Sequence, residues 1–271
     1  MDVYIFDIVR SSLVDGPGVR TTVFFKGCNL NCAWCHNPEG KFPNPQPAFF
    51  ADRCTGCGLC REVCPRKDGD CTLCGACVNI CPENARRIYG RKYSLKELTE
   101  ILLADVRYYR ATGGGVTFSG GECMLYPRIL GRLLRKLDEA GVRAAIDTAG
   151  NVPYASFQSL FSFRPLFLYD LKAVSRSVHK RGTGVDNRLI LENLDRLISD
   201  RQDVIIRVPV IPGFNDGREL AKVRRYVAER GLTAEYLPFH TMGEGKQKAL
   251  LAAGSCFPPV REPIKKTTES V

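Results

Sequence analysis

The hydrophobic residues follow two different periodicities along most of this chain. Short apolar runs of the strand type alternate with longer segments in which apolar residues recur every three or four positions. Strands that alternate with helices in this way indicate βα units and a parallel sheet. The strand-like runs lie at residues 21–27, 115–121, 142–148, 167–172, 203–212 and 233–240, and helix-like segments lie at 126–141, 154–160, 187–200 and 217–230.

Six such units predict an α/β fold, and more narrowly a partial (β/α)6 barrel of the TIM type. A doubly wound open sheet is the alternative, but G-x-G-x-x-G is absent after the first strand-like run. One helix start is visible in detail, because Ser94 and Glu97 have the spacing of a capping box ahead of the periodic residues 98–109.

Residues 47–90 interrupt this pattern with a cysteine-rich composition. We therefore expect two domains, a barrel formed by residues 1–46 and 91–271 and an inserted domain at 47–90. After Lys246 the sequence has neither strong helical periodicity nor strand alternation. The last element of the barrel is accordingly expected to be absent or atypical.

The overall composition narrows the class of protein. Its 44% hydrophobic and 25% charged residues are ordinary for a globular protein. The net charge of +10 is spread along the chain, so we expect no nucleic-acid partner. No apolar run is long enough for a membrane span, and the first residues do not resemble a secretory signal. A cytoplasmic monomer without a membrane partner is the expectation.

The cysteines point to metal chemistry. The chain has 13 of them, and eleven fall between Cys28 and Cys81. A disulfide framework is typical of small secreted domains, whereas clustered cysteines in an intracellular chain more often bind metal. Cys123 and Cys256 match no ligand spacing and are expected to be free thiols.

Three of these cysteines stand at a C-x3-C-x2-C spacing, as Cys28, Cys32 and Cys35. A structural zinc site takes four ligands, and His36 could serve as a fourth only awkwardly because it adjoins Cys35. A cubane iron–sulfur cluster normally takes one thiolate per iron, so three thiolates leave one iron open. The spacing favours a [4Fe-4S] cluster with a vacant iron that a small molecule can bind.

Two further runs of four cysteines each match the bacterial ferredoxin pattern C-x2-C-x2-C-x3-C-P. Two zinc knuckles are the alternative interpretation. The duplicated pattern predicts a ferredoxin-like insert with two more [4Fe-4S] clusters, although the link between Cys64 and Cys71 is short for an exchange of fourth ligands. By that pattern one cluster takes Cys54, Cys57, Cys60 and Cys81, and the other takes Cys64, Cys71, Cys74 and Cys77.

Polar or glycine residues stand at the end of every strand-like run. A turn, a helix cap, an ion pair or a solvated charge explains each of them alone, and His179 is expected in an exposed loop. The carboxyl ends of barrel strands open onto one face, however, so their recurrence favours a ligand site. After the three cysteines, these residues are Gly120, Gly121 and Glu122, then Asp147 and Thr148, Asp170 and Lys172, Arg207, and His240.

These motifs together resemble a known family. C-x3-C-x2-C followed by SGGE is similar to the radical S-adenosylmethionine (SAM) superfamily. More narrowly, DGPGVRTTVFFKGCNLNCAWCHNPE, DTAG, YDLK, RVPVIPGFND and LPFHTMGEGK resemble the activating enzymes of glycyl radical enzymes. The ferredoxin-like insert is similar to the subgroup of that family with extra clusters.

The resemblance implies a reaction and partners. The enzyme would reductively cleave SAM to a 5′-deoxyadenosyl radical, which would abstract a hydrogen from a glycine of a glycyl radical enzyme. Flavodoxin or ferredoxin would donate electrons. Alternatives are another radical SAM enzyme that modifies a peptide or small molecule, a ferredoxin-like electron carrier, and a zinc-based nucleic-acid binder.

The resemblance also implies roles for particular residues. Cys28, Cys32 and Cys35 would hold the SAM cluster. Asp147, Thr148 and Asp170 would form a monovalent-cation site. The residues implied to contact SAM are Trp34, Cys35, His36, Gly120, Gly121, Glu122, Asp170, Leu171, Lys172, Arg207 and His240.

Overall fold

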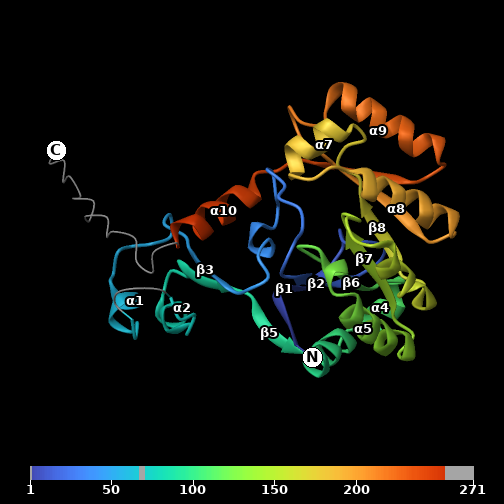
Figure 1. Cartoon of the computed structure of the whole chain (residues 1–271). Helices are drawn as coiled ribbons and strands as arrows, with labels where there is room; N and C mark the ends of the chain where they lie inside the picture. The colour runs from blue at the N-terminus through green and yellow to red at the C-terminus, as the bar shows by residue number, and fades with distance from the viewer. Residues whose placement is uncertain (1, 67–70, 254–271) are drawn as a thin grey trace, which may run out of the picture.

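The structure is a computed structural model that describes residues 2–66 and 71–253. Within these residues an eight-stranded sheet has the order β10-β9-β8-β7-β6-β2-β1-β5 (Figure 1). Its parallel part consists of the six runs that the sequence predicts, which confirms a mixed α/β fold with a parallel sheet. These strands are β2 (Arg20–Phe25), β6 (Gly115–Gly120), β7 (Arg143–Thr148), β8 (Leu166–Asp170), β9 (Val204–Val210) and β10 (Ala234–Pro238).

Two strands of this sheet were not expected from the sequence. β1 (Asp2–Ser12) pairs antiparallel with β2, and β5 (Arg91–Ser94) pairs antiparallel with β1. The register of β1 against β2 shifts twice along its length. Such bulges break the strict alternation of apolar and polar residues by which a strand is recognised. In the described chain β5 and β10 are the two edges, so the sheet does not close.

Most of the expected helices are present and follow their strands. Ser94 caps the first of them, since its hydroxyl accepts from Glu97 N at 3.2 Å and its own N–H donates to the Glu97 carboxylate at 2.8 Å. In Figure 1 the helices lie on one side of the sheet. They are α3 (Leu95–Leu103), α4 (Val106–Thr112), α5 (Pro127–Glu139), α6 (Tyr154–Gln158), α8 (Arg188–Ser199) and α9 (Gly217–Glu229).

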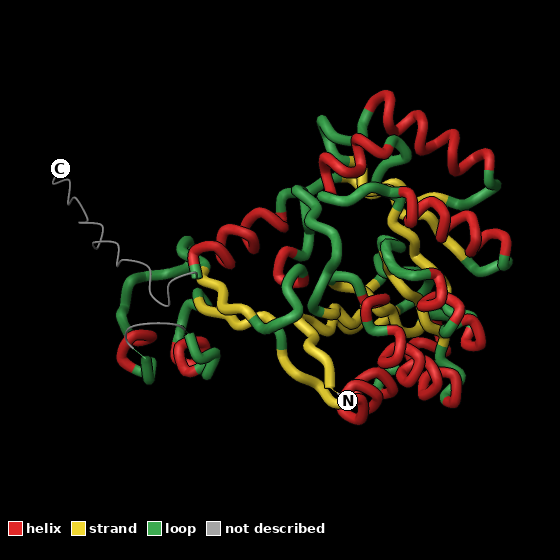
Figure 2. The backbone as a smooth tube through the Cα atoms, in the orientation of Figure 1, coloured by secondary structure: helices red, strands yellow, loops and turns green. Residues whose placement is uncertain are grey.

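The main hydrophobic core lies between these helices and the sheet. Leu130 and Leu133 of α5 and Phe118 of β6 are buried there. The other face of the sheet carries loops, visible in Figure 2 as the tubes between the strands and the last helix. Because no layer of helices covers that face in the described part of the chain, it is available for a site. Short 3₁₀ turns are η1 (Pro38–Gly40), η2 (Cys123–Leu125) and η3 (Phe161–Phe163).

Residues 46–89, which we call the cysteine-rich unit, contain two strands and two short helices. The base of the unit is a two-stranded sheet in which β3 (Gln46–Phe49) pairs antiparallel with β4 (Arg86–Tyr89). The two short helices lie between these strands in the sequence, α1 (Leu59–Glu62) and α2 (Ala76–Ile80). This unit lies at the opposite end of the molecule from α9 (Figure 1).

Two helices contradict expectations from the sequence. α7 (Arg176–Thr183) contains His179, which is 1% exposed, so the prediction of an exposed loop there is wrong. α10 (Met242–Ala252) extends past Lys246, where no helical periodicity was expected. Its segment contains two glycines, which disfavour a helix by about 1 kcal/mol each, and most of its apolar residues stand together at 249–252 instead of recurring at helical intervals. Tertiary contacts must therefore stabilise it.

Some expectations fall outside the described residues. These are the free thiol of Cys256, the chain end after residue 253 and part of the link between Cys64 and Cys71. Among the helices of the described ranges, none combines the length and the apolar content needed to cross a bilayer.

Candidate functional site

The predicted site residues are brought together because the carboxyl ends of the parallel strands share one edge of the sheet. The register places Phe25 beside Gly120, Thr148 beside Tyr169, and Asp170 beside Arg207. β10 then adds Glu235 beside Arg207. Residues far apart in the sequence thus lie side by side on neighbouring strands.

The loop after β2 carries the first three cysteines. Backbone hydrogen bonds close its base, from Gly27 N to Gly40 O at 2.8 Å and from Cys28 N to Lys41 O at 3.0 Å. Its far side rests on α7, where Ala33 N donates to Gly182 O at 2.9 Å. We call residues 27–41 the cysteine loop. The two ends of the loop are bonded to each other, and its middle is bonded to α7.

Cys28, Cys32 and Cys35 are free, partly buried thiols. Burial raises the pKa of Cys28 to about 12 and also raises the pKa of the other two. The Lys172 ammonium opposes this effect at Cys32. In the described chain no three His, Cys, Asp or Glu side chains converge on one metal ion. A cubane needs no such convergence, because it binds each thiolate through a different iron.

The aromatic side chains Trp34, Phe214, Phe239 and His240 form part of the wall of a cavity of about 370 Å³ beside the cysteine loop. The rings of Trp34 and Phe214 lie 4.1 Å apart between centroids, and those of His36 and His240 lie 4.2 Å apart. Sequence reasoning missed Phe214, although the motif RVPVIPGFND contains it. It also missed two further residues of the cavity wall, Arg181 and Gly182.

The turn after β6 is packed tightly against the cysteine loop. A Cβ atom on Gly121 would overlap the carbonyl oxygens of Gly27 and Gly40, and one on Gly120 would overlap the backbone of Phe25. Only glycine permits these close approaches, and Gly120 also has a φ of +112°. The two glycines therefore join β2, the cysteine loop and β6 at one point.

Glu122 points into the protein. It is fully buried and accepts hydrogen bonds from Thr148 Oγ1 at 2.8 Å, Ala149 N at 2.9 Å and Met124 N at 3.1 Å. Burial raises its pKa to about 7, although these donors lower it. The carboxylate thus links the ends of β6 and β7, and Thr148 is turned toward it.

The end of β8 faces the cysteine loop with a buried ion pair. Lys172 Nζ donates to Asp170 Oδ2 at 2.6 Å, and Leu171 between them is 1% exposed. Burial alone lowers the pKa of Lys172, but Asp170 and the Cys32 thiol raise it overall. The lysine therefore stays charged next to the thiols.

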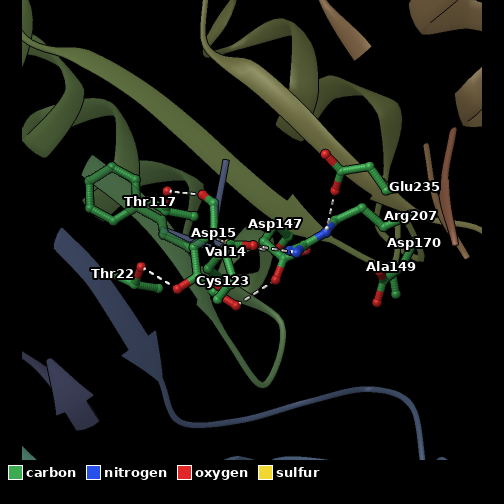
Figure 3. A network of polar contacts seen from close by, with 12 residues as sticks. Val14, Asp15, Thr22, Thr117, Cys123, Asp147, Ala149, Asp170, Arg207 and Glu235 are labelled. Atoms are coloured by element: carbon green, nitrogen blue, oxygen red, sulfur yellow. Dashed lines mark hydrogen bonds and ion pairs between the residues drawn. The ribbon is translucent and has the colours of Figure 1, made fainter. Parts of the chain in front are cut away.

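Arg207 connects several strand ends in the network of Figure 3. Its Nη1 lies 3.7 Å from Asp147 Oδ1, its Nε lies 3.4 Å from Glu235, and its Nη2 donates to Val14 O at 2.7 Å. Asp147 also accepts from Ser119 Oγ at 2.6 Å. Burial, then the nearby Asp170, raises the pKa of Asp147 to about 6. Among the described residues its buried Oδ1 finds no hydrogen-bond donor.

The cysteine-rich unit contains two small cavities, each with cysteines from both ferredoxin-type runs. In both, three cysteines of one run are joined by the last cysteine of the other. Cys64, Cys71, Cys74 and Cys77 line one cavity, and Cys54, Cys57, Cys60 and Cys81 line the other.

Two residues outside the site behave structurally. His179 Nδ1 lies 2.8 Å from Val185 O and 3.0 Å from Thr183 Oγ1 inside the turn that ends α7. Cys123 is a buried free thiol, as predicted, and its Sγ lies 3.3 Å from Phe118 O.

Known proteins are similar to this chain in sequence and in fold. The signature of the radical SAM superfamily matches residues 22–226. The choline trimethylamine-lyase activating enzyme of Oleidesulfovibrio alaskensis is 37% identical, over 91% of this chain and 86% of that protein. The benzylsuccinate synthase activating enzyme of Thauera aromatica is 41% identical, over 93% and 82%.

Among solved structures, Streptococcus suis SuiB bound to its precursor peptide SuiA aligns with a TM-score of 0.50 at 12% identity. The alignment covers 82% of this chain and 39% of SuiB, and it supports the fold alone. Membership of the superfamily implies a [4Fe-4S] cluster and SAM. The chain belongs to the radical SAM superfamily and, within it, to the activating enzymes of glycyl radical enzymes.

Proposed function

We propose that this protein activates a glycyl radical enzyme. With a [4Fe-4S] cluster and SAM bound, these groups would supply one-electron cleavage of SAM to methionine and a 5′-deoxyadenosyl radical. That radical takes a hydrogen atom from a glycine of the partner and becomes 5′-deoxyadenosine, which leaves the radical on the glycine. The observation that carries the proposal is the cysteine loop, which stands at the carboxyl ends of the parallel strands against the aromatic cavity.

The donor set of the cysteine loop fits a [4Fe-4S] cluster with one open iron. The loop has three thiols and no fourth cysteine. Burial disfavours free thiolates at Cys28, Cys32 and Cys35, and bound iron would compensate their charge. When bound, the cluster supplies the electron, and the protein orients SAM and excludes water.

The surrounding residues suit the different parts of SAM. The Gly120-Gly121 backbone suits the methionine amino group, whereas the Glu122 carboxylate is already engaged inside the protein. Lys172 and Arg207 supply positive charge for the carboxylate and the ribose end. The full proposed set is Trp34, Cys35, His36, Gly120, Gly121, Glu122, Asp170, Leu171, Lys172, Arg207 and His240, with Glu122 and Leu171 acting through position.

A monovalent cation is proposed between the ends of β7 and β8. Asp147 Oδ1 is buried without a donor in the described structure, and Asp170 is close enough to raise the pKa of Asp147. A cation there would neutralise the two carboxylates. Thr148 is the weakest member of this proposed site because its hydroxyl is committed to Glu122.

We also propose the finer architecture. Residues 1–46 and 91–271 form a partial (β/α)6 barrel, and residues 47–90 form a ferredoxin-like insert with two [4Fe-4S] clusters. The pairing of β3 with β4 at the base of the insert supports this boundary. The two cavities support an exchange of the fourth cysteine between the runs. A flavodoxin or ferredoxin donor, a monomeric state and a cytoplasmic location stay predictions.

The first experiment measures SAM cleavage. Protein purified without oxygen and reconstituted with iron and sulfide should form 5′-deoxyadenosine from SAM when a low-potential reductant is added. Cys32→Ala should abolish this product, and Cys123→Ser, which changes a thiol outside the cluster loop, should retain it. Absence of the product with the unmodified chain would overturn the proposal.

The second experiment tests the partner. A mixture with a candidate glycyl radical enzyme should develop an electron paramagnetic resonance (EPR) doublet on that enzyme. A partner whose glycine is replaced by alanine should develop none. SAM cleavage without a radical on any candidate partner would instead favour a different radical SAM reaction.

A further inference from the structure

α10 crosses between two parts of the molecule that the sequence keeps apart. It begins just after His240 at the aromatic cavity and ends beside the cysteine-rich unit (Figures 1 and 2). It packs on η1 of the cysteine loop near one end and on β3 near the other. The helix therefore touches both regions that the proposed function assigns to iron–sulfur clusters.

Four residues on one face of α10 and directly after it make the main contacts. Gly243, Lys246, Ala249 and Ala253 recur at intervals of three or four residues, which places them in a row along the helix. The exposed residue Leu251 lies on the opposite side of the helix from this row.

The first contact in the row is with the cysteine loop. A Cβ atom on Gly243 would overlap the carbonyl oxygen of Cys35, so the helix backbone lies directly on the chain next to a proposed cluster ligand. Only glycine allows this approach.

The second contact is an ion pair with the same loop. Lys246 Nζ lies 2.7 Å from Glu39 Oε1 and donates to Asn37 Oδ1 at 3.1 Å. The Glu39 side chain is 4% exposed, and its Oε2 accepts no hydrogen bond in the described chain. Lys26, which is fully buried, also contacts this turn, because its Nζ donates to Glu39 O at 2.7 Å. A buried carboxylate with so few partners depends strongly on Lys246.

The last contacts are with the cysteine-rich unit. Ala249 packs with Ala48 of β3 and Tyr89 of β4. Ala253, directly after the helix, packs with Phe49 and lines the cavity of Cys64, Cys71, Cys74 and Cys77. α10 and the residue that follows it thus extend from Cys35 to that cavity.

We propose that α10 is a strut that fixes the cysteine loop relative to the cysteine-rich unit, with Lys246 as the positioning residue that attaches it to the loop. This inference rests on the proposed function for its purpose, since electron transfer between clusters depends on a constant separation. The alternative is that α10 only covers the apolar surface of the two-stranded sheet formed by β3 and β4. In that case Lys246 would contribute to the stability of α10 but not to the order of the loop.

Hydrogen exchange on the reconstituted protein distinguishes a strut from a helix that only covers β3 and β4. Lys246→Met removes the charge and keeps the stem, so amide exchange in residues 35–41 should rise about tenfold, as expected for a lost hydrogen bond to a charged group. Lys246→Arg should stay near the unmodified protein. Lys248→Met changes an exposed lysine of the same helix and should leave the loop unchanged.

A spectroscopic measurement adds a readout that stability alone would not move. The microwave power that half-saturates the EPR signal of the SAM cluster reports how close other paramagnetic clusters are. It should change in Lys246→Met and stay constant in Lys246→Arg and Lys248→Met. If Lys246→Met does not fold, the double variant Glu39→Gln/Lys246→Met, which removes both charges of the pair, replaces it.

Equal loop exchange in Lys246→Met and Lys248→Met, or a change confined to residues 242–252, would overturn the strut. The exchange measurement requires no SAM, so its result is independent of catalysis. Failure of the unmodified protein to cleave SAM would overturn the proposed function while leaving the exchange result to decide the role of α10.

Discussion

Arg207 and Asp147 come from two strands that are not neighbours, yet Arg207 Nη1 lies 3.7 Å from Asp147 Oδ1. β8 lies between their strands and supplies Asp170, which raises the pKa of both side chains. The same guanidinium reaches Val14 in the connection between β1 and β2 (Figure 3). One arginine side chain therefore connects strand ends that are far apart in the sequence.

Removal of this cation should destabilise the protein. Arg207→Gln leaves Asp147 without its opposing charge in a largely buried position, and we expect a loss of about 1–3 kcal/mol in the free energy of unfolding. Arg188→Gln breaks only an exposed pair with Glu192 and should cost about 0.5 kcal/mol or less. Chemical denaturation measures both variants. Equal losses would show that the contacts of Arg207 contribute no more to the free energy of unfolding than an exposed ion pair does.

Glu122 should make stability depend on pH. Because burial raises its pKa from 4.5 to about 7, the folded state binds its proton more tightly than the unfolded state. This contribution to stability is complete below the unfolded pKa and is lost as the pH rises through about 7. Glu122→Gln cannot titrate, so its stability should fall less between these two values. Denaturation curves at several pH values test this. If the free energy of unfolding changes with pH by the same amount in both proteins, the prediction is contradicted.

Gly182 should control the aromatic wall of the cavity. A Cβ atom there would overlap Phe214 and lie 2.6 Å from a ring atom of Trp34. Gly182→Ala should therefore separate the two rings and shift the emission of Trp34, the only tryptophan of the chain. Gly131→Ala is the control, since its added Cβ meets Leu160 at an ordinary 3.7 Å. Unchanged emission in Gly182→Ala would mean that the wall adapts without cost.

Cysteine substitutions should reveal which thiols share a cluster. Cys81 lines the cavity of the first run and Cys64 that of the second. Cys81→Ala and Cys57→Ala should therefore remove the same EPR signal, and Cys64→Ala and Cys74→Ala should remove the other. Each loss should lower the iron content by about four atoms. If Cys64→Ala and Cys57→Ala remove the same signal, each cluster is bound within its own run.

The structure also shows why part of the site could not be predicted from the sequence. The residue types at the strand ends are visible in the sequence, but their directions are not. Glu122 occupies an expected position and yet points inward, because Thr148 and Ala149 offer donors there. Phe214 stands in a quoted motif and gained no role until it was seen against Trp34.

The sequence by itself determined the order of the βα units, the capped start of α3 and the spacing of the eleven clustered cysteines. These features depend on residues close together in the chain, where periodicity, capping and ligand spacing act. The tertiary structure alone decided the strand β1, the buried His179 and the path of α10. Each of these is stabilised by partners distant in the chain, and no local pattern records which distant residues will meet.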